Sequence, residues 1–363
     1  MTTPSPTPSA SPLGSGERVL MGIGFDPMRL RDLRVSALIA LGVAVTHIIF
    51  GAIVRISGSG MGCGDHWPKC YGYWFPPLTR MDLIIEVMHR YLAVVLFIAI
   101  AAMALKAWRM RTVRGIGGHG GAGRPAYLAV ALWFAPALFG AVTVRFANAP
   151  WATVIHKLLA ASLLAVLSLT VVRSGGFGGA RAFFAAREER ATDKAWRSIL
   201  VAAGLALVVI LMGGLTAKIP DAAVACRGFP LCGEGSLGGG AQHVQLTHRV
   251  LAYLLILHLI GLPFAFRKRA EPPVLITGAW VLAGLGAWQV LVAAAMVLGD
   301  FPVNHATRSV HQATGIAIWL AAITMTWLTQ IANGRAAGIE GLPPRAGARA
   351  RAELAARPAE GER

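Results

Sequence analysis

Eight apolar stretches, each close to the roughly 20 residues that a helix needs to cross a bilayer, constrain this chain more than any other feature. They lie near residues 35–54, 83–105, 126–147, 151–172, 198–217, 244–266, 274–298 and 309–331. Only 14% of the residues are charged, whereas a soluble domain has about 25%. The sequence therefore predicts an all-α integral membrane protein with eight transmembrane helices.

The positions of the 34 lysines and arginines predict how the chain is oriented. Most of them fall at the two ends and in alternate connections, and connections rich in Lys and Arg face the cytoplasm. We therefore expect both termini to be cytoplasmic. Because these charges lie between apolar runs and not on one basic face, the net charge of +17 does not indicate nucleic-acid binding.

The same pattern divides the chain into five parts. Flexible tails are expected over residues 1–33 and 332–363. Between them we expect a four-helix bundle over residues 34–173, a cytoplasmic linker over 174–197 and a second four-helix bundle over 198–331.

An internal repeat relates the two halves. Residues 67–70, Trp-Pro-Lys-Cys, recur after one deletion as 229–232, Phe-Pro-Leu-Cys. The other matched pairs are Gly51 and Gly214, Arg55 and Lys218, Cys63 and Cys226, Glu86 and Gln245, His89 and His248, Arg90 and Arg249, and His156 and His311. Blocks that recur in the same order predict two parallel repeats of four helices, packed side by side with one site in each core. The alternative is a single mixed bundle of eight helices.

Four histidines share one predicted depth in the membrane. His89, His156, His248 and His311 each lie about four to seven residues inside the outer end of an even-numbered helix, roughly 6–10 Å below the boundary. Polar residues there are costly and indicate function. Two ligands per bundle suit two hemes, because heme iron takes only axial ligands from the protein. Zinc or copper would require three or four converging ligands, which these helices do not offer.

Basic residues accompany the four histidines. Arg90, Lys157, Arg249 and Arg308 each lie within three residues of one, where heme propionates would pair with them. We expect these contacts first from Arg90 and Arg249, and the alternative is that the side chains extend to the membrane surface. The remaining histidines are expected in loops or in ordinary packing: His47, His66, His119, His243, His258 and His305. For His305 a propionate contact is an alternative.

Each half carries one cysteine pair in an outer loop. Cys63 and Cys70 flank six residues, and Cys226 and Cys232 flank five. Both pairs face the oxidising side, where disulfides persist, so each is expected to close a small loop over its bundle. Metal binding is a weaker alternative because the spacing is not C-x-x-C. A redox role for Cys63 and Cys70 also stays open.

The clearest chemical difference between the halves is Glu86 against Gln245. Glu86 lies three residues before His89, on the same helical face and one turn further out. A carboxylate inside a membrane costs about 2.5–3.5 kcal/mol even on the lenient insertion scale. This difference predicts proton chemistry at the first site and a held cofactor at the second.

These motifs together resemble the heme A synthase family. Residues 55–63 read Arg-Ile-Ser-Gly-Ser-Gly-Met-Gly-Cys, and 86–90 read Glu-Val-Met-His-Arg, which is similar to the first-half signature of that family. The likeness extends over residues 33–328. It departs at His66, where the family more often has a compact Pro-Asp-Trp-Pro, and a second cysteine pair occurs in only part of the family.

The resemblance implies an enzyme that oxidises the C8 methyl group of heme O to a formyl group, giving heme A for terminal oxidases. It implies that His89 and His156 flank the substrate heme, and that His248 and His311 ligate a permanent heme b. Glu86 would assist the oxidation, and the first-loop cysteines would form a disulfide.

The same resemblance implies a bacterial inner-membrane protein surrounded by lipid. Its expected partners are heme O, the heme O synthase and an electron carrier, with no nucleic acid. Two other classes remain as alternatives: a diheme b-type electron-transfer cytochrome and a heme transporter or chaperone. An electron-transfer cytochrome would want hemes near both membrane faces, and a transporter would need exchangeable ligation without Glu86.

Overall fold

The computed structural model describes residues 26–298 and 305–335, and this part of the chain is helical, with no named strand. Eight of the described helices are long and apolar enough to cross a membrane. They are α2 (Pro27–Ile56), α3 (Met81–Arg109), α4 (Gly123–Arg145), α5 (Pro150–Arg173), α7 (Asp193–Thr216), α8 (Gly239–Lys268), α9 (Pro273–Leu298) and α10 (His305–Ala332). The chain is therefore an all-α, multi-pass membrane protein, which confirms that prediction.

Helix α2 begins earlier than the apolar stretch from which it was predicted. The Asp26 carboxylate caps it by accepting hydrogen bonds from the backbone N–H groups of Met28 and Arg29, both at 3.1 Å. Pro27, next to the cap, suits the first turn because a helix needs no N–H donor there. Residues 27–33, placed in the N-terminal tail by sequence, are thus helical, and Leu33 in this segment is fully buried.

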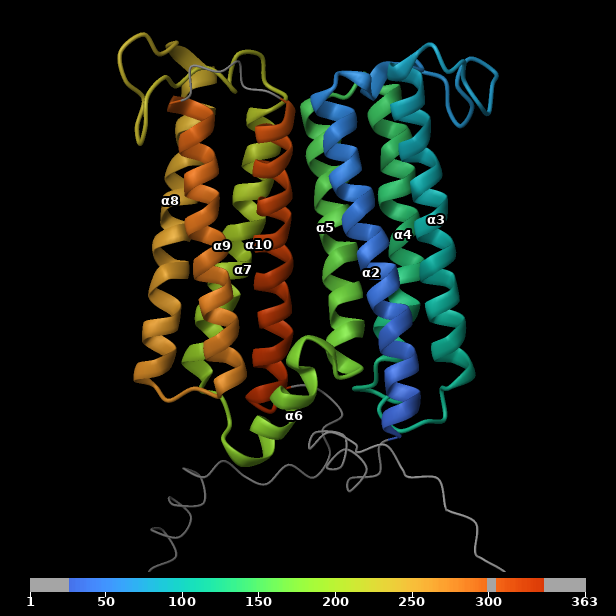
Figure 1. The fold of residues 1–363 in the computed structure, drawn as a ribbon, viewed down its shortest axis with the longest axis vertical. Helices are drawn as coiled ribbons and strands as arrows, with labels where there is room; N and C mark the ends of the chain where they lie inside the picture. Colours follow the sequence, from blue (N-terminus) through green and yellow to red (C-terminus); the bar gives the residue numbers. More distant parts are fainter. Residues whose placement is uncertain (1–25, 299–304, 336–363) are drawn as a thin grey trace, which may run out of the picture.

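The eight spans form two groups that stand side by side (Figure 1). Helices α2, α3, α4 and α5 pack against one another and are called the N-terminal bundle below. Helices α7, α8, α9 and α10 form the C-terminal bundle. The helices are thus grouped by sequence half and are not mixed in one bundle of eight.

The two bundles meet mainly along α5 and α10, with α2 and α7 beside them, and this contact is called the seam below. The indole N–H groups of Trp319 and Trp327 on α10 donate to the carbonyl oxygens of Ala161 (3.2 Å) and Ala165 (3.0 Å) on α5. Interhelical hydrogen bonds of this kind add to close packing, since apolar burial alone drives little association within lipid. The seam is a specific contact and fixes the bundles relative to each other.

A short helix ties the bundles together at one end. Residues 174–197, expected as a linker, contain α6 (Gly179–Glu188), which packs against α10. The N–H of Ala191, just after α6, donates to the carbonyl oxygen of Ala332 at 3.1 Å. Figure 1 shows α6 below the long helices, at the end where α2 begins and α10 ends.

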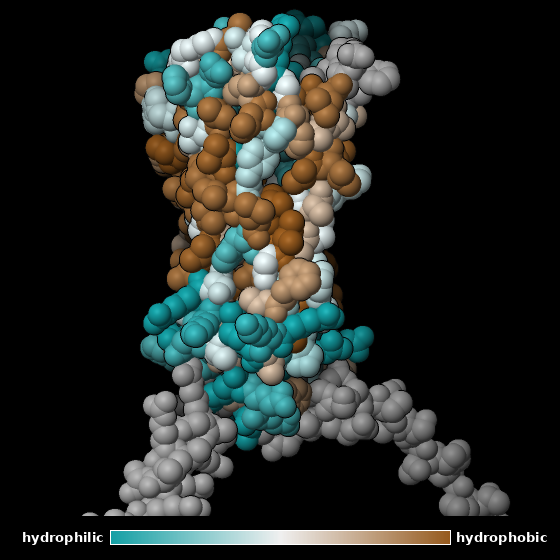
Figure 2. Space-filling model, turned by 90° about the vertical axis from the view of Figure 1, so that its left-hand side faces the viewer, coloured by the Kyte–Doolittle hydropathy of each residue, from teal (hydrophilic) through white to brown (hydrophobic). Residues whose placement is uncertain are grey.

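The surface of the helices is apolar over the middle of the molecule. In Figure 2 a broad hydrophobic band separates hydrophilic regions at the two ends. Large side chains such as Ile98, Leu257 and Leu291 are more than 60% exposed. An apolar band of this extent would be a liability in water but suits contact with the hydrocarbon of a bilayer.

Candidate functional site

Two disulfide loops mark one end of the molecule, called the disulfide end below. Cys63–Cys70 closes a ring in the connection between α2 and α3, and Cys226–Cys232 does so between α7 and α8. Their Cα–Cα distances are 5.0 and 4.6 Å. These are the two pairs expected from the sequence, and no described cysteine is free.

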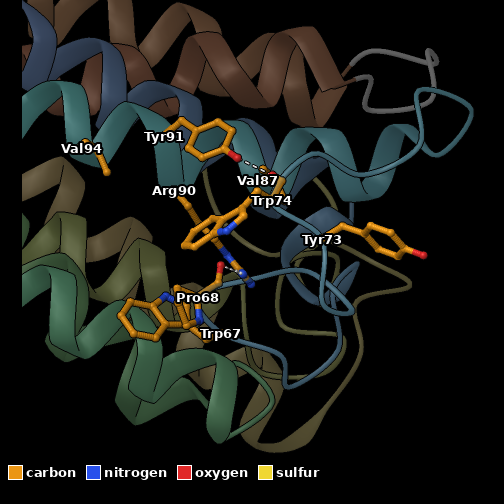
Figure 3. Close-up of a pocket in the computed structure, with 8 residues that line it drawn as sticks. All are labelled: Trp67, Pro68, Tyr73, Trp74, Val87, Arg90, Tyr91 and Val94. Carbon is orange, nitrogen blue, oxygen red and sulfur yellow. Dashed lines mark hydrogen bonds between the residues drawn. The ribbon is translucent and has the colours of Figure 1, made fainter.

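Glu86 on α3 holds the first loop in place. Its carboxylate accepts a hydrogen bond from the N–H of Cys63 at 2.9 Å and pairs with Arg90, one helical turn further on, at 2.6 Å. The Arg90 guanidinium also donates to the carbonyl oxygens of Pro68 (2.8 Å) and His66 (3.0 Å), as part of Figure 3 shows. Glu86 is only 4% exposed, so this is a largely buried ion pair that anchors the loop.

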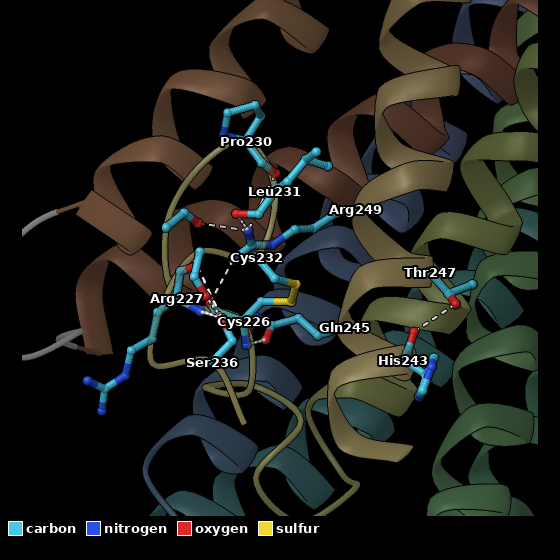
Figure 4. The surroundings of a disulfide bond; sticks show 12 residues. Cys226, Arg227, Pro230, Leu231, Cys232, Ser236, His243, Gln245, Thr247 and Arg249 are labelled. Carbon is cyan, nitrogen blue, oxygen red and sulfur yellow. Dashed lines mark hydrogen bonds between the residues drawn. A yellow bond between two sulfur atoms is a disulfide. The ribbon is translucent and has the colours of Figure 1, made fainter. Parts of the chain in front are cut away.

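The same positions hold the second disulfide loop, between α7 and α8, in the C-terminal bundle (Figure 4). The side-chain oxygen of Gln245 accepts a hydrogen bond from the N–H of Cys226. The guanidinium of Arg249 donates to the carbonyl oxygens of Gly228 (2.8 Å) and Cys226 (2.9 Å). Here the loop is anchored without a carboxylate, and Gln245 instead donates its amide N–H to Ala223 at 3.2 Å.

Arg90 and Arg249 are therefore engaged in a way that the sequence analysis missed. Both were expected to pair with heme propionates, yet in this structure both guanidinium groups donate to loop carbonyls. A signal was present in the sequence, because each arginine lies four residues after the side chain that holds the first cysteine. Residues at this spacing share a helical face.

The N-terminal bundle brings its two histidines together. His89 on α3 and His156 on α5 lie within electrostatic reach of each other. The Nδ1 atoms of both rings are buried and have no hydrogen-bond partner. Buried polar atoms are almost always paired in proteins, so buried Nδ1 atoms without a partner on two rings of one bundle point to a site that takes a ligand.

The C-terminal bundle does the same with His248 on α8 and His311 on α10. These two rings also lie within electrostatic reach, and both Nδ1 atoms are buried without a partner. The amide of Gln289 on α9 donates to the backbone oxygen of His311 at 3.0 Å. The four histidines singled out in the sequence thus lie two in each bundle, near the disulfide end.

Glycines make room for these rings. A Cβ atom placed on Gly51 of α2 would lie 2.9 Å from Cε1 of His89, and one on Gly213 of α7 would lie 3.0 Å from Cε1 of His248. The first distance is shorter than real carbon–carbon contacts, and the second is tighter than most of them, so a side chain at either position would press on the ring. The repeat in the sequence paired Gly51 with Gly214. In the structure, however, Gly213 faces His248, whereas Gly214 faces the side chain of Lys157.

A fifth histidine belongs to the first site. His47 on α2, expected to be ordinary packing, stacks on His89 with ring centroids 4.3 Å apart. Its Nε2 atom is buried and unpartnered. Sequence could have placed it, since His47 lies four residues before Gly51, on the same face of α2. By contrast, His258 has an ordinary role, because its Nε2 lies 2.8 Å from the carbonyl oxygen of Ser198.

An apolar pocket lies beside the first loop (Figure 3). Trp67 and Trp74 of the loop line it together with Tyr91 and Val94 of α3. The Tyr91 hydroxyl donates to the carbonyl oxygen of Trp74, which holds the loop against the helix. Aromatic side chains of this kind are enriched where a protein crosses from lipid to water.

The residues present suit heme better than a closed metal centre. Among the described residues no group of three or more His, Cys, Asp or Glu side chains could hold a metal ion. In each bundle two histidines have buried Nδ1 atoms without a partner, and one of the two faces a glycine of a neighbouring helix. Such a pair suits the axial ligation that heme iron takes from a protein. Fold and site together define a multi-pass membrane protein with one such histidine pair in each of two helical bundles.

The chain belongs to the cytochrome oxidase assembly protein family. The COX15-CtaA model of that family matches residues 34–86 and 81–323. It is also similar to proteins named heme A synthase. That of Geobacillus thermodenitrificans is 28% identical over 70% of this chain and 77% of its own. That of Alkalihalophilus pseudofirmus is 29% identical over 62% of this chain and 73% of its own, and that of Geobacillus kaustophilus is 29% identical over 70% and 77%.

Proposed function

We propose that this protein is a heme A synthase, an enzyme that oxidises the C8 methyl group of heme O to a formyl group. The observation that carries the proposal is the pair of histidines in each bundle, with buried Nδ1 atoms that have no partner, at the same end of the molecule. The family and the names of the relatives supply the chemistry of such a site. The product, heme A, serves terminal oxidases.

The two sites have different roles in this proposal. The N-terminal bundle, residues 34–173, holds the substrate heme O between His89 and His156. The C-terminal bundle, residues 198–331, holds a permanent heme b on His248 and His311. When bound, heme b supplies one-electron redox chemistry beside the substrate, and an electron carrier takes up the electrons that heme b passes on.

The oxidation needs a place for protons to go. The methyl group becomes a hydroxymethyl and then a geminal diol, which loses water to leave the aldehyde. Each of the two oxidations formally adds the oxygen atom of one water molecule and removes two electrons and two protons, and the electrons pass to the electron carrier. We assign Glu86 as the catalytic proton acceptor, because its carboxylate is the acidic group next to His89 on the same helical face.

Several further parts of the proposal rest on the sequence. The matched residue pairs indicate a tandem, parallel duplication of four helices. The excess of Lys and Arg in alternate connections indicates that both termini are cytoplasmic and that the disulfide end faces outward. The bacterial relatives favour the bacterial inner membrane, where a heme O synthase would deliver the substrate.

The placement of the histidines also weighs against electron transfer across the membrane as the main role. A diheme cytochrome that moves electrons from one face to the other would need hemes near both faces. The four histidines lie near the disulfide end only, each within ten residues of the start of α3, α5, α8 or α10. Two hemes at one depth suit the oxidation of one heme, with the other heme as its electron-transfer partner.

Turnover by the purified protein tests the proposal. We expect the protein, given heme O and a redox partner under air, to yield heme A when the hemes are extracted and separated by chromatography. A hydroxymethyl intermediate should appear first and then decline. Heme O recovered unchanged from protein that has retained its heme b would reject the synthase and favour the electron-transfer cytochrome.

A further inference from the structure

Four basic side chains gather at the seam between the bundles, near the disulfide end. Each comes from a different element of the seam. They are Arg55 on α2, Lys157 on α5, Lys218 just after α7, and Arg308 on α10. Of these four residues, only Lys157 and Arg308 were expected from the sequence to pair with an anion.

Electrostatic interactions connect these four residues into one group. The charge of Arg55 is repelled by that of Arg308, and the charges of both Lys157 and Lys218 are repelled by that of Arg55. Lys157 also interacts with Lys218 and with His248 in the other bundle. The group is therefore shared between the two bundles.

Direct contacts show the side chains crossing the seam. The Lys157 side chain lies against α7, where a Cβ atom on Gly214 would be 3.0 Å from its Cδ and 3.2 Å from its Nζ. In the opposite direction, Gln312 of α10 accepts a hydrogen bond from the Arg55 guanidinium at 2.7 Å. Lys157 and Gln312 each directly follow a histidine of a site pair, His156 and His311.

Within the part of the chain that the structure describes, no acidic side chain pairs with this group. The Nε of Arg55 is buried and has no hydrogen-bond partner, and all four residues are partly buried. Unpaired like charges in a low-dielectric setting are unfavourable, and such charges in membrane proteins are retained where they bind something.

From these observations we infer that Arg55, Lys157, Lys218 and Arg308 form a shared carboxylate-binding site at the seam, which takes the propionates of both hemes. This rests on the proposed function, and it names what the site recognises beyond the iron. A heme carries two propionates, so two hemes bring four carboxylates to four cations. Arg90 and Arg249, which already hold the loops, are then not needed for this role.

Recognition through the seam would orient both hemes. With their propionates directed to one cation group, the two macrocycles would extend from the seam into opposite bundles. Lys157 has a special place because it belongs to the substrate bundle and yet its side chain lies against Gly214 of α7, in the other bundle.

The first experiment uses the full-length protein with its resident heme. Lys157→Gln should lower the midpoint potential of that heme, because a nearby positive charge favours the reduced form. Gln312→Glu should lower it too and reduce heme retention, since it places a carboxylate beside Arg55 in competition with a propionate. Arg145→Gln is the matched control, because this cation at the disulfide end of α4 is 76% exposed. An unchanged potential in both seam variants would overturn the inference.

The second experiment asks which carboxylate is bound. Full-length protein made in heme-limited cells is given heme b or its dimethyl ester, and retention is followed by absorption. We expect the wild type to hold heme b at least about tenfold more tightly than the ester, and Arg55→Gln, Lys157→Gln and Lys218→Gln to reduce that ratio toward one. Equal binding of acid and ester by the wild type would overturn the inference.

A third outcome separates heme from lipid. If the ratio stays high in the variants, but they lose phosphatidylglycerol that the wild type retains from mixed nanodiscs, the site binds a lipid phosphate and the inference is wrong. The proposed function is judged separately. If wild-type protein binds no heme of either form, the synthase itself fails, whereas tight binding of both forms rejects only the seam site.

Discussion

At the scale of single residues, Glu86 and Gln245 separate two roles that one position can combine. Each side chain offers an oxygen to the N–H of the first cysteine of its loop, so that amide is satisfied in both bundles. Only Glu86 adds a negative charge, and it forms an ion pair with Arg90. The loop contact therefore needs an acceptor but no charge. The proposed role of Glu86 in proton transfer gives a reason for a carboxylate at this position.

Glu86→Gln tests that separation. We expect the variant to fold and to keep its resident heme, because Gln retains the oxygen that accepts from Cys63. It should lose proton transfer, and an acid–base group typically contributes about 10²- to 10⁴-fold to a rate. Chromatography of extracted hemes should show less heme A and, if the second oxidation is the slower, more hydroxymethyl intermediate.

The reciprocal variant serves as the control. Gln245→Glu should leave turnover nearly intact, since it lies in the bundle assigned to heme b. Wild-type levels of heme A from Glu86→Gln would reject the catalytic role and leave Glu86 as an anchor of the loop.

The glycines that face the histidines give a second matched pair. Gly213→Ala should displace the His248 ring, because its Cβ would meet Cε1 at 3.0 Å. Overpacking of this kind costs about 1–3 kcal/mol, so the affinity for the resident heme should fall by at least about fivefold. Gly51→Ala should leave the resident heme in place and impair turnover. Spectra that are unchanged in Gly213→Ala would show that α7 does not limit the His248 ring.

At the scale of elements, the two disulfide loops are anchored in the same manner onto α3 and α8. Each is closed by a disulfide, held at its first cysteine from the helix, and bound through its carbonyl groups by an arginine one turn further along. A tyrosine hydroxyl adds a further bond in each, from Tyr91 to Trp74 and from Tyr253 to Pro230. This arrangement makes each loop a fixed cover over one end of its bundle.

The cysteine pairs provide a prediction about these covers. Peptide mapping without reductant should find Cys63–Cys70 and Cys226–Cys232, which are 7 and 6 residues apart, and no pairing between halves. On the chain-entropy account a ring of this size contributes about 2.5 kcal/mol of stability. Cys226→Ser with Cys232→Ser should therefore lower the unfolding temperature while leaving the loop's arginine contacts available. Free thiols in the mature protein would contradict the pairing.

At the scale of the whole molecule, the two histidine sites lie in separate bundles, and the bundles contact each other at the seam. Trp319 and Trp327 fix α10 against α5, and the hydroxyl groups of Ser168 and Thr324 meet 2.7 Å apart within this contact. His156 and His311 lie on these two central helices, whereas His89 and His248 lie on α3 and α8. Each predicted heme thus has one ligand on the seam and one away from it.

The assignment of the two sites predicts which histidines hold the resident heme. His248→Ala and His311→Ala should each remove most of the low-spin heme b absorption from purified protein. His89→Ala should retain most of it and abolish turnover, because it changes only the substrate site. Loss of the resident heme in His89→Ala together with its retention in His248→Ala would reverse the roles of the bundles.

The sequence by itself determined the features that depend on local composition and spacing. The lengths of the apolar runs specified eight spans, because a helix in lipid must satisfy its own backbone and cover a fixed thickness. The spacing of cysteines within single loops indicated both disulfides. The four histidines stood out because each lies at a similar distance from a predicted helix end. The repeat matched each histidine of the first half with one of the second half.

Only the tertiary structure decided which faces of distant segments meet. It turned Arg90 and Arg249 toward loop carbonyls, and it put Gly213 and not Gly214 opposite a histidine. It also stacked His47 on His89. The cations of the seam come from four elements spread over more than 250 residues, and no local pattern connects them. Spacing along a helix defines its faces, but the partner of each face depends on how whole helices rotate and pack against one another.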